Sequence, residues 1–190
     1  MTARLYLGFL LLLAAERVLE LRISRRNARA AFARGGVEVG RGHYRVMAAL
    51  HTAFLLSCAL EVVLLRRPFP GPPGALALVG VAASQALRYW AIATLGDRWN
   101  TRVIVVPREP PVTSGPYRWV RHPNYVSVIA EMALVPLVHG AWLTAIAFSI
   151  ANAALLVVRI RAEERALGGA YAAAFAGRPR FIPARRPGPG

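Results

Sequence analysis

The chain has 190 residues, of which 56% are hydrophobic and 17% are charged, and this composition is too apolar for an ordinary soluble domain. The formal net charge of +15 would suit a nucleic-acid-binding protein, but the arginines lie between apolar segments, as in membrane proteins that follow the positive-inside rule, so we expect no nucleic-acid partner. The single cysteine, Cys58, excludes an intrachain disulfide and a cysteine metal cluster, and the four histidines lack metal-ligand spacing.

The first apolar run, residues 5–21, predicts a membrane helix. With Arg4 ahead of it the run resembles a signal peptide, but Ala14-Ala15 is a weak cleavage site and is followed directly by Glu16-Arg17. We therefore expect an uncleaved anchor. The arginine-rich stretch 22–41 is expected to form a polar loop after it.

Two further apolar runs, residues 44–65 and 75–95, predict membrane helices. A polar stretch separates them from residues 125–158, an apolar run that at about 1.5 Å per residue would make a helix of roughly 50 Å, against about 30 Å of bilayer hydrocarbon. Pro136 and the His139-Gly140 pair favour a turn near its middle. This run therefore predicts two antiparallel helices.

The fold class expected is all-α, an integral membrane protein with about five transmembrane helices and no strands of consequence, the last two helices forming a hairpin. The arginine-rich segments follow the first helix, precede the fourth and close the chain. With an odd number of spans, the positive-inside rule puts the N-terminus outside and these segments in the cytoplasm.

The sequence GPYRWVRHPNY, residues 115–125, joins a basic loop to the apolar hairpin. Proline suits the first turn of a helix, so the fourth helix is predicted to begin near Pro123. Its free N–H groups, with Arg118 and Arg121 nearby, would attract an anion. The alternative is a capped helix with interfacial aromatic residues and arginines that reach to the bilayer surface.

A second polar cluster, RIRAEE, covers residues 159–164 at the far end of the hairpin. Arg159 and Glu163 are four residues apart and are predicted to share one helical face. The alternative is a solvated helix end with a salt bridge that stabilises it little.

Several ionisable or polar residues lie within the apolar runs, where such groups are costly and usually face a cavity or a partner. They are Glu61, Gln85, Arg88 and Glu131, and His51 is grouped with them. Interhelical hydrogen bonding, or placement at the bilayer interface, is the alternative for each. Glu131 lies about two turns into the helix from Tyr125 and is predicted to line a pocket below the loop.

The paired motifs GPYRWVRHPNY and RIRAEERAL…Y…RPRFIP resemble the isoprenylcysteine carboxyl methyltransferase family, whose members are integral membrane enzymes that use S-adenosyl-L-methionine. The N-terminal segments ERVLELRISRRN and GHYRVMAALHTAFLLSCALE are similar to a bacterial subgroup. Some members of that subgroup O-methylate alkylresorcinols or alkylpyrones. The segment 109–111 differs from the eukaryotic pattern, which argues against prenylated-protein recognition more than against cofactor binding.

The resemblance implies a division into N-terminal transmembrane helices (1–95), an S-adenosylmethionine-binding methyltransferase core (96–183) and a disordered tail (184–190). It implies that the following residues bind the cofactor: Glu109, Pro110, Pro111, Val112, Tyr117, His122, Pro123, Asn124, Tyr125 and Glu163. Arg159 falls where the eukaryotic enzymes of the family place an arginine for the substrate. A carboxylate acceptor needs no base, whereas a phenol or enol would, and Glu131 or His51 are the candidates for that role.

Two other functions remain open from the sequence. An NADPH-dependent sterol reductase would share a similar C-terminal hairpin but usually has more helices. A non-enzymatic membrane subunit would use its arginines to bind anionic lipid or a partner. The methyl acceptor is also open: a prenylcysteine-like carboxylate, a phenolic lipid or another lipophilic small molecule.

Overall fold

The computed structural model describes residues 1–183, and the predicted disordered tail 184–190 lies outside them. The all-α prediction is confirmed. Five long helices account for most of the described chain: α1 (Ala3–Ala33), α2 (Arg41–Leu64), α3 (Pro72–Leu95), α4 (Pro123–Leu137) and α5 (Trp142–Ala174). Two short 3₁₀ helices, η1 (Gly96–Arg98) and η2 (Gly115–Arg118), flank the polar loop before α4.

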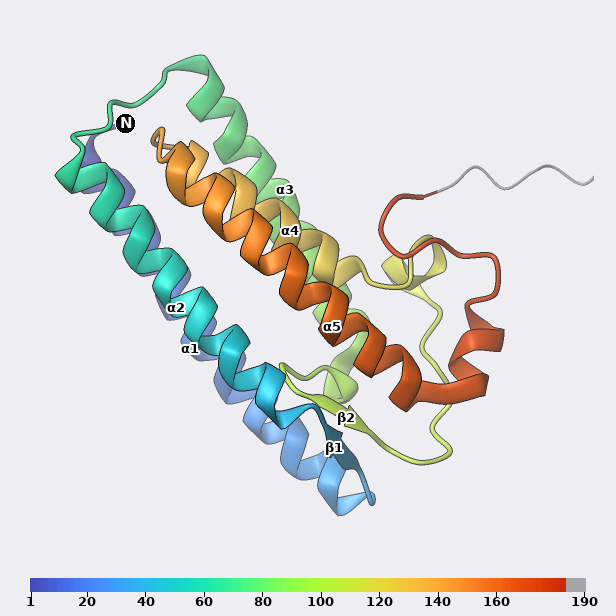
Figure 1. The fold of residues 1–190 in the computed structure, drawn as a ribbon. Helices are drawn as coiled ribbons and strands as arrows, with labels where there is room; N and C mark the ends of the chain where they lie inside the picture. The colour runs from blue at the N-terminus through green and yellow to red at the C-terminus, as the bar shows by residue number, and fades with distance from the viewer. Residues whose placement is uncertain (184–190) are drawn as a thin grey trace, which may run out of the picture.

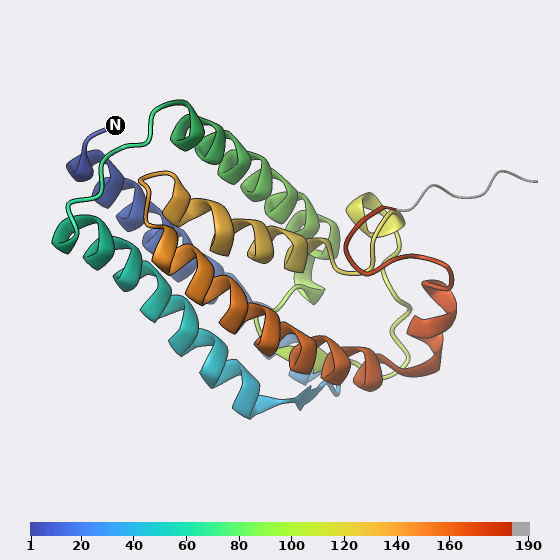
Figure 2. The ribbon, with the colours of Figure 1, turned by 45° about the horizontal axis from the view of Figure 1, so that its top comes forward.

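The five helices lie alongside one another in a bundle whose two ends differ (Figures 1 and 2). The N-terminus, the α2–α3 connection and the α4–α5 turn lie at one end. The loop between α3 and α4 and the last part of the chain lie at the other. Along the bundle, α4 packs between α3 and α5, and α5 also contacts α2. The polar motifs of the sequence therefore gather at one end.

Among residues 1–183, three helices are long and apolar enough to cross a membrane: Tyr44–Leu64, Pro72–Arg98 and Trp142–Ala174. They support an integral membrane protein. The α4 helix has 15 residues, so at about 1.5 Å per residue it is shorter than the hydrocarbon core of roughly 30 Å. The count of five complete spans stays a prediction.

The α1 helix continues to Ala33, so the predicted polar loop from residue 22 is wrong for its first half. Its inner face explains this, because Asn27 is buried and its Nδ2 donates to the carbonyl of Trp99 at 2.8 Å. Ser24 Oγ contacts Asn100 Oδ1 at 2.9 Å. Arginine is also a good helix former, so an arginine-rich stretch with one packed face extends the helix.

A short ribbon was not expected. Strand β1 (Val37–Val39) pairs antiparallel with β2 (Val103–Val105), with Val37 opposite Val105. Both strands are rich in β-branched valine, which suits extended backbone. Three-residue strands are too short to show an alternating pattern, which is why the sequence did not indicate them. The ribbon ties the α1–α2 connection to the loop before α4.

The predicted hairpin is confirmed, and a carboxylate from another helix caps its second arm. Pro123 begins α4, and α5 begins at Trp142. Glu61 at the end of α2 accepts from the backbone N–H groups of Leu143 at 3.2 Å and Thr144 at 2.7 Å. A negative charge there satisfies unpaired N–H groups and the helix dipole. Glu61 thus serves an interhelical contact, the alternative that the sequence left open.

Candidate functional site

The start of α4 and the end of the described chain are held together by backbone hydrogen bonds. Arg121 N donates to the carbonyl of Pro179 at 2.9 Å, and His122 N donates to that of Arg180 at 3.1 Å. The turn before them depends on Gly115, which has a φ of 53°. A Cβ there would lie 2.4 Å from Thr94 Oγ1, so the close approach to α3 requires glycine. The GPYRWVRHPNY loop is thereby fixed against both α3 and the C-terminal segment.

Three side chains from α4 and α5 form what we name the tyrosine cluster: Tyr125, Arg159 and Glu163. Arg159 Nε donates to the Tyr125 hydroxyl at 2.7 Å, and that hydroxyl donates to Glu163 Oε2. Arg159 and Glu163 therefore face the same partner from one side of α5, as their spacing predicts. The Arg159 guanidinium is also anchored to the loop, because Nη2 donates to the carbonyl of Thr101 at 2.7 Å.

Arg159 is 5% exposed, yet the partners that it contacts among residues 1–183 are a neutral hydroxyl and a carbonyl rather than a carboxylate. Buried arginines are normally paired with an acid, because an uncompensated charge is costly to desolvate. A guanidinium has five N–H donors, of which these contacts use two. Arg159 thus retains capacity to bind an anionic oxygen.

A neighbouring group links the motif loop, α5 and the C-terminal segment. His122 is buried, and its Nε2 lies 3.1 Å from Glu164 Oε1. Arg180 donates to the two oxygens of Glu164 at 3.0 and 2.6 Å. Glu164 lies in the polar cluster 159–164 that the sequence indicated, but neither Glu164 nor Arg180 was predicted to be a site residue. The adjacent acids 163 and 164 were the available signal, because neighbours on a helix point about 100° apart and so reach different partners.

Aromatic side chains cover the loop side of the site. Tyr117 packs with Tyr171 and Phe175, and the ring centroids of the last two are 4.6 Å apart. Burial raises the pKa of the Tyr117 hydroxyl well above its usual value, and the negative charge of Glu163 raises it further. Tyr117 is therefore neutral at physiological pH and can stack or donate a hydrogen bond. Tyr171 and Phe175 were not among the residues predicted from the sequence.

Asn124 lies between Pro123 and Tyr125 in the first turn of α4. Its Oδ1 is buried and has no hydrogen-bond partner among residues 1–183. Burying an oxygen without a hydrogen-bond partner destabilises the folded protein. Asn124 Oδ1 is therefore a candidate to accept a hydrogen bond from a ligand.

The predicted backbone-contact segment 109–112 lies in the polar loop. Glu109 is paired with Arg34 at 3.1 Å and with Arg98 at 3.5 Å. Arg98 Nη1 also donates to the carbonyl of Pro110 at 2.6 Å. The side chain of Glu109 is thus neutralised by the protein, and within the described residues no hydrogen bond or ion pair joins this segment to the tyrosine cluster.

Glu131, the predicted base, lies in a different cluster. Its carboxylate receives two hydrogen bonds from Arg88, at 2.9 and 2.7 Å. Arg17 lies 3.8 Å from Glu131 and 2.7 Å from Glu20. We call this set the intramembrane network: Glu16, Arg17, Glu20, Gln85, Arg88 and Glu131. His51, the other candidate base, has its Nδ1 2.8 Å from the carbonyl of Met47 in its own helix.

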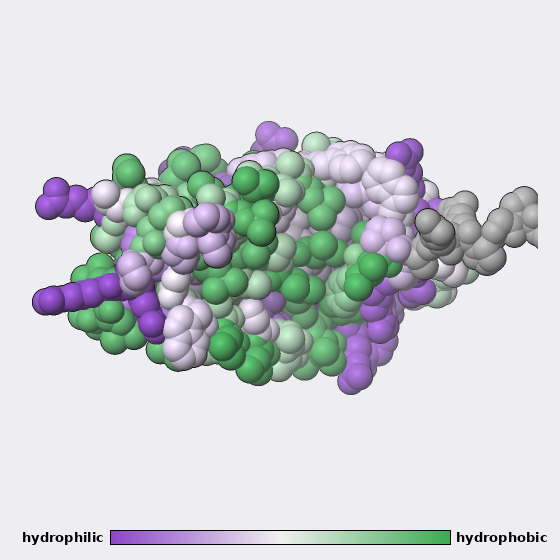
Figure 3. Space-filling model, turned by 90° about the horizontal axis from the view of Figure 1, so that it is seen from above, coloured by the Kyte–Doolittle hydropathy of each residue, from purple (hydrophilic) through white to green (hydrophobic). Residues whose placement is uncertain are grey.

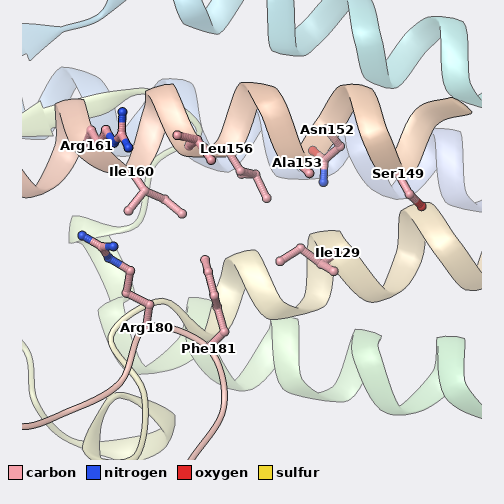
Figure 4. Close-up of a pocket in the computed structure, with 10 residues that line it drawn as sticks. Ile129, Ser149, Asn152, Ala153, Leu156, Ile160, Arg161, Arg180 and Phe181 are labelled. Atoms are coloured by element: carbon pink, nitrogen blue, oxygen red, sulfur yellow. The ribbon is translucent and has the colours of Figure 1, made fainter. Parts of the chain in front are cut away.

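A pocket of about 290 Å³ lies between α4 and α5, and we call it the α4–α5 pocket (Figure 4). Its walls are mainly apolar, with Ile129 from α4 across from Leu156 of α5, and Phe181 of the C-terminal segment across from Ile160. Leu156 and Ile160 also pack against Tyr125, so this pocket adjoins the tyrosine cluster. One end carries Arg180, and further along α5 lies Asn152, which is buried with no partner for its Oδ1 in the described chain.

Comparisons with known proteins bear on these clusters. The model of the isoprenylcysteine carboxyl methyltransferase (ICMT) family matches residues 75–169. The chain is 41% identical over 157 residues to the uncharacterized protein YpbQ of Bacillus subtilis, an alignment that covers 82% of this chain and 92% of the relative. It is 27% identical over 154 residues to an uncharacterized protein of Haemophilus influenzae, with coverage of 80% and 89%. The family match includes the whole tyrosine cluster.

Proposed function

This chain belongs to the isoprenylcysteine carboxyl methyltransferase family, and we propose that it is a membrane-embedded S-adenosylmethionine-dependent O-methyltransferase. Its acceptor in this proposal is a lipophilic molecule with a reactive carboxylate, phenol or enol oxygen. The observation that carries the proposal is Arg159, a buried guanidinium whose contacts in the described chain are neutral and which lies beside an apolar pocket. Such a group is suited to an anionic acceptor oxygen.

The residues present fit the cofactor. S-adenosylmethionine has a cationic amine, a carboxylate and a polar nucleoside with ribose hydroxyls. Glu163 supplies a carboxylate for a cationic or ribose donor, and Asn124 supplies an unpaired buried oxygen. The neutral Tyr117 can stack on the nucleoside or donate to it. We propose that these residues, with His122, Pro123 and Tyr125, hold the cofactor.

S-adenosylmethionine supplies, when bound, a methyl group on a sulfonium, which is already a strong electrophile. The protein's task is then alignment and the exclusion of water. Arg159 orients the acceptor oxygen through its remaining N–H donors, while Tyr125 fixes the guanidinium and links it to Glu163. In this proposal Arg159, Tyr125 and Glu163 form one connected set of side chains, and this set positions the acceptor and the cofactor relative to each other.

The α4–α5 pocket is proposed to hold the hydrocarbon part of the acceptor. It is lined mainly by apolar side chains and adjoins Tyr125 through Leu156 and Ile160 (Figure 4). A chain that enters from the bilayer would meet the reactive centre at the Tyr125 end. Asn152 then contacts a polar group of the acceptor along this wall.

Whether the acceptor is a carboxylate or a phenol decides the need for a base. A carboxylate is ionised at neutral pH and Arg159 suffices for it, whereas a phenol has a pKa near 10 and needs help. Glu131 remains the proposed base for the second case, although it is paired with Arg88. The resemblance of the N-terminal segments to a bacterial subgroup, some members of which O-methylate alkylresorcinols or alkylpyrones, makes phenolic and enolic lipids the first acceptors to test.

The proposed setting is a bacterial inner membrane with the N-terminus outside and the site in the cytoplasm, where S-adenosylmethionine is available. The arginine-rich segments that flank the site support this orientation through the positive-inside rule. A cysteine-accessibility scan of exposed loop positions in intact cells would check it.

The test is calorimetry with S-adenosylmethionine on the detergent-purified chain, followed by radiolabelled methyl transfer to a panel of prenylcysteines and alkylresorcinols. Saturable cofactor binding and label in an extracted lipid are expected. Absence of cofactor binding would overturn the proposal. Hydride transfer from NADPH to a sterol would favour a reductase instead. If neither activity were detected, a non-enzymatic membrane subunit would be the alternative.

A further inference from the structure

The second half of α1 carries four arginines on its outer face: Arg22, Arg25, Arg26 and Arg29. All four are exposed. At about 100° per residue they fall within an arc of roughly 100° around the helix, and together they span about 10 Å along it. They therefore form one compact stripe, which we call the arginine stripe.

The arginine stripe differs from Arg17 of the same helix, and from Arg34 directly after it, in its lack of partners. Arg17 is bonded to Glu20 at 2.7 Å, and Arg34 is bonded to Asp97 at 2.6 Å. Within residues 1–183, by contrast, no ion pair or side-chain hydrogen bond involves a member of the stripe. Four positive charges on one helix face without internal compensation repel one another, and an external anion would relieve this repulsion.

The same side of α1 is apolar toward the N-terminus. Leu11, Leu12, Val18 and Leu19 are 71%, 68%, 49% and 56% exposed, and helical spacing puts them in line with the arginine stripe. Figure 3 shows the corresponding pattern on one face of the whole molecule, with hydrophobic side chains over the middle and most of the hydrophilic ones toward the ends. An apolar surface that passes directly into cations matches a lipid leaflet, in which acyl chains end at phosphates.

We propose that the arginine stripe binds the headgroups of anionic phospholipids, such as phosphatidylglycerol, in the leaflet on that side. Guanidinium groups bind phosphate oxygens through paired N–H donors. The stripe extends about 10 Å along the helix, which is enough to cross the headgroup layer of roughly 5–7 Å on one side of a bilayer. The apolar residues above it accommodate the acyl chains of the same lipids.

The inner face of this helical segment gives the lipid contact a structural consequence. Asn27 donates to the carbonyl of Trp99, and Ser24 contacts Asn100 and Thr101. The carbonyl of Thr101 in turn accepts from Arg159. Lipid bound outside α1 therefore steadies the helix that holds the loop behind Arg159.

The test measures lipid binding and needs no methyl transfer, so its failure is distinct from failure of the proposed function. The full chain, purified in neutral detergent, is titrated with phosphatidylglycerol or phosphatidylcholine, and lipid adducts are counted by native mass spectrometry. The wild type is expected to retain phosphatidylglycerol about tenfold better, and the double variant Arg25→Gln/Arg29→Gln should lose most of this preference.

The matched control is Arg4→Gln/Arg66→Gln, which removes two exposed arginines at the opposite end of the bundle. It should keep the preference, and circular dichroism should show both variants folded. Equal retention of the two lipids by the wild type, or an equal loss in the control, would overturn the proposal. Arginine-dependent binding of soluble poly-glutamate without any preference for phosphatidylglycerol would overturn it in favour of an acidic protein partner.

Discussion

Helix α4 contributes to two buried polar clusters that are built on opposite principles. In the intramembrane network Glu131 meets Arg88 through two hydrogen bonds, so each buried charge has an opposite charge in direct contact. In the tyrosine cluster a hydroxyl stands between Arg159 and Glu163. The two clusters lie about two turns apart on the same helix, with Tyr125 in one and Glu131 in the other.

The difference is the basis on which we propose a ligand-binding role for one cluster and a structural role for the other. A bidentate ion pair satisfies its own charges and locks α4 to α3, so it has little capacity left for a ligand. Arg159 is buried without such a partner in the described chain, and Asn124 on α4 and Asn152 on α5 each bury an oxygen that has no hydrogen-bond partner there. Groups left in this state cost stability, and a bound ligand would offset the cost.

The largest expected effect tests whether the ion pair between Arg88 and Glu131 stabilises the fold. Glu131→Leu leaves the Arg88 guanidinium buried without its partner and should lower the free energy of unfolding by about 3–5 kcal/mol. The double variant Arg88→Met/Glu131→Leu removes both charges and should recover most of that loss. Thermal unfolding in detergent measures both variants.

The same double variant also tests Glu131 as a base. If the only role of Glu131 is to form the ion pair with Arg88, the folded double variant should methylate a phenolic acceptor at nearly the wild-type rate. A folded double variant that methylates carboxylates but not phenols would instead assign the proton transfer to Glu131.

The next effect concerns Arg159. Arg159→Gln removes the charge that is proposed to orient the acceptor, and methyl transfer should fall by about 100-fold, which corresponds to roughly 2.7 kcal/mol of transition-state stabilisation. Cofactor affinity should stay within a few-fold of the wild type, because the guanidinium is assigned to the acceptor. Calorimetry and rate measurements on the same preparation separate the two. A large loss of cofactor affinity with unchanged turnover would reverse this assignment.

Glu163 is expected to show the complementary pattern. Glu163→Gln keeps the size of the side chain but removes the charge that would pair with a cationic or ribose donor, so cofactor affinity should fall about tenfold. His122→Ala is expected to weaken it as well. Calorimetry with S-adenosylmethionine measures both.

Glu164→Gln is the matched control for Glu163, because Glu164 contacts His122 and Arg180 rather than the Tyr125 hydroxyl. It should loosen the C-terminal segment and change affinity less. Unchanged affinity in both Glu163→Gln and His122→Ala would reject the cofactor site.

Much of this arrangement could be predicted from the sequence, because its signals are local. Pro123 marks a helix start by its missing N–H, and the spacing of Arg159 and Glu163 fixes a shared face. The partners could not be predicted in the same way. Glu164 meets Arg180 only because the chain turns back after Gly168, whose φ of 70° breaks the helical path of α5.

The end of α1 was predicted wrongly for a similar reason. Its arginines resemble a loop when they are read by polarity alone, whereas the buried Asn27 on the opposite face holds the segment in a helix. Contacts between distant segments decide such cases, and a single sequence does not show them.

The smallest expected effect tests whether the unpaired buried oxygen of Asn152 binds a polar group of the acceptor. Asn152→Leu replaces a buried amide with an apolar side chain of similar size, so the midpoint of thermal unfolding should rise by about 2–4 °C. Acceptors with a polar group along the chain should then lose about threefold in kcat/KM relative to plain alkyl acceptors. Ala153→Leu, in the same pocket, is the control for lost volume and should slow both acceptor classes alike. A less stable Asn152→Leu variant with unchanged acceptor preference would make Asn152 structural, and the proposed contact between Arg159 and the acceptor would then have to be judged from Arg159→Gln alone.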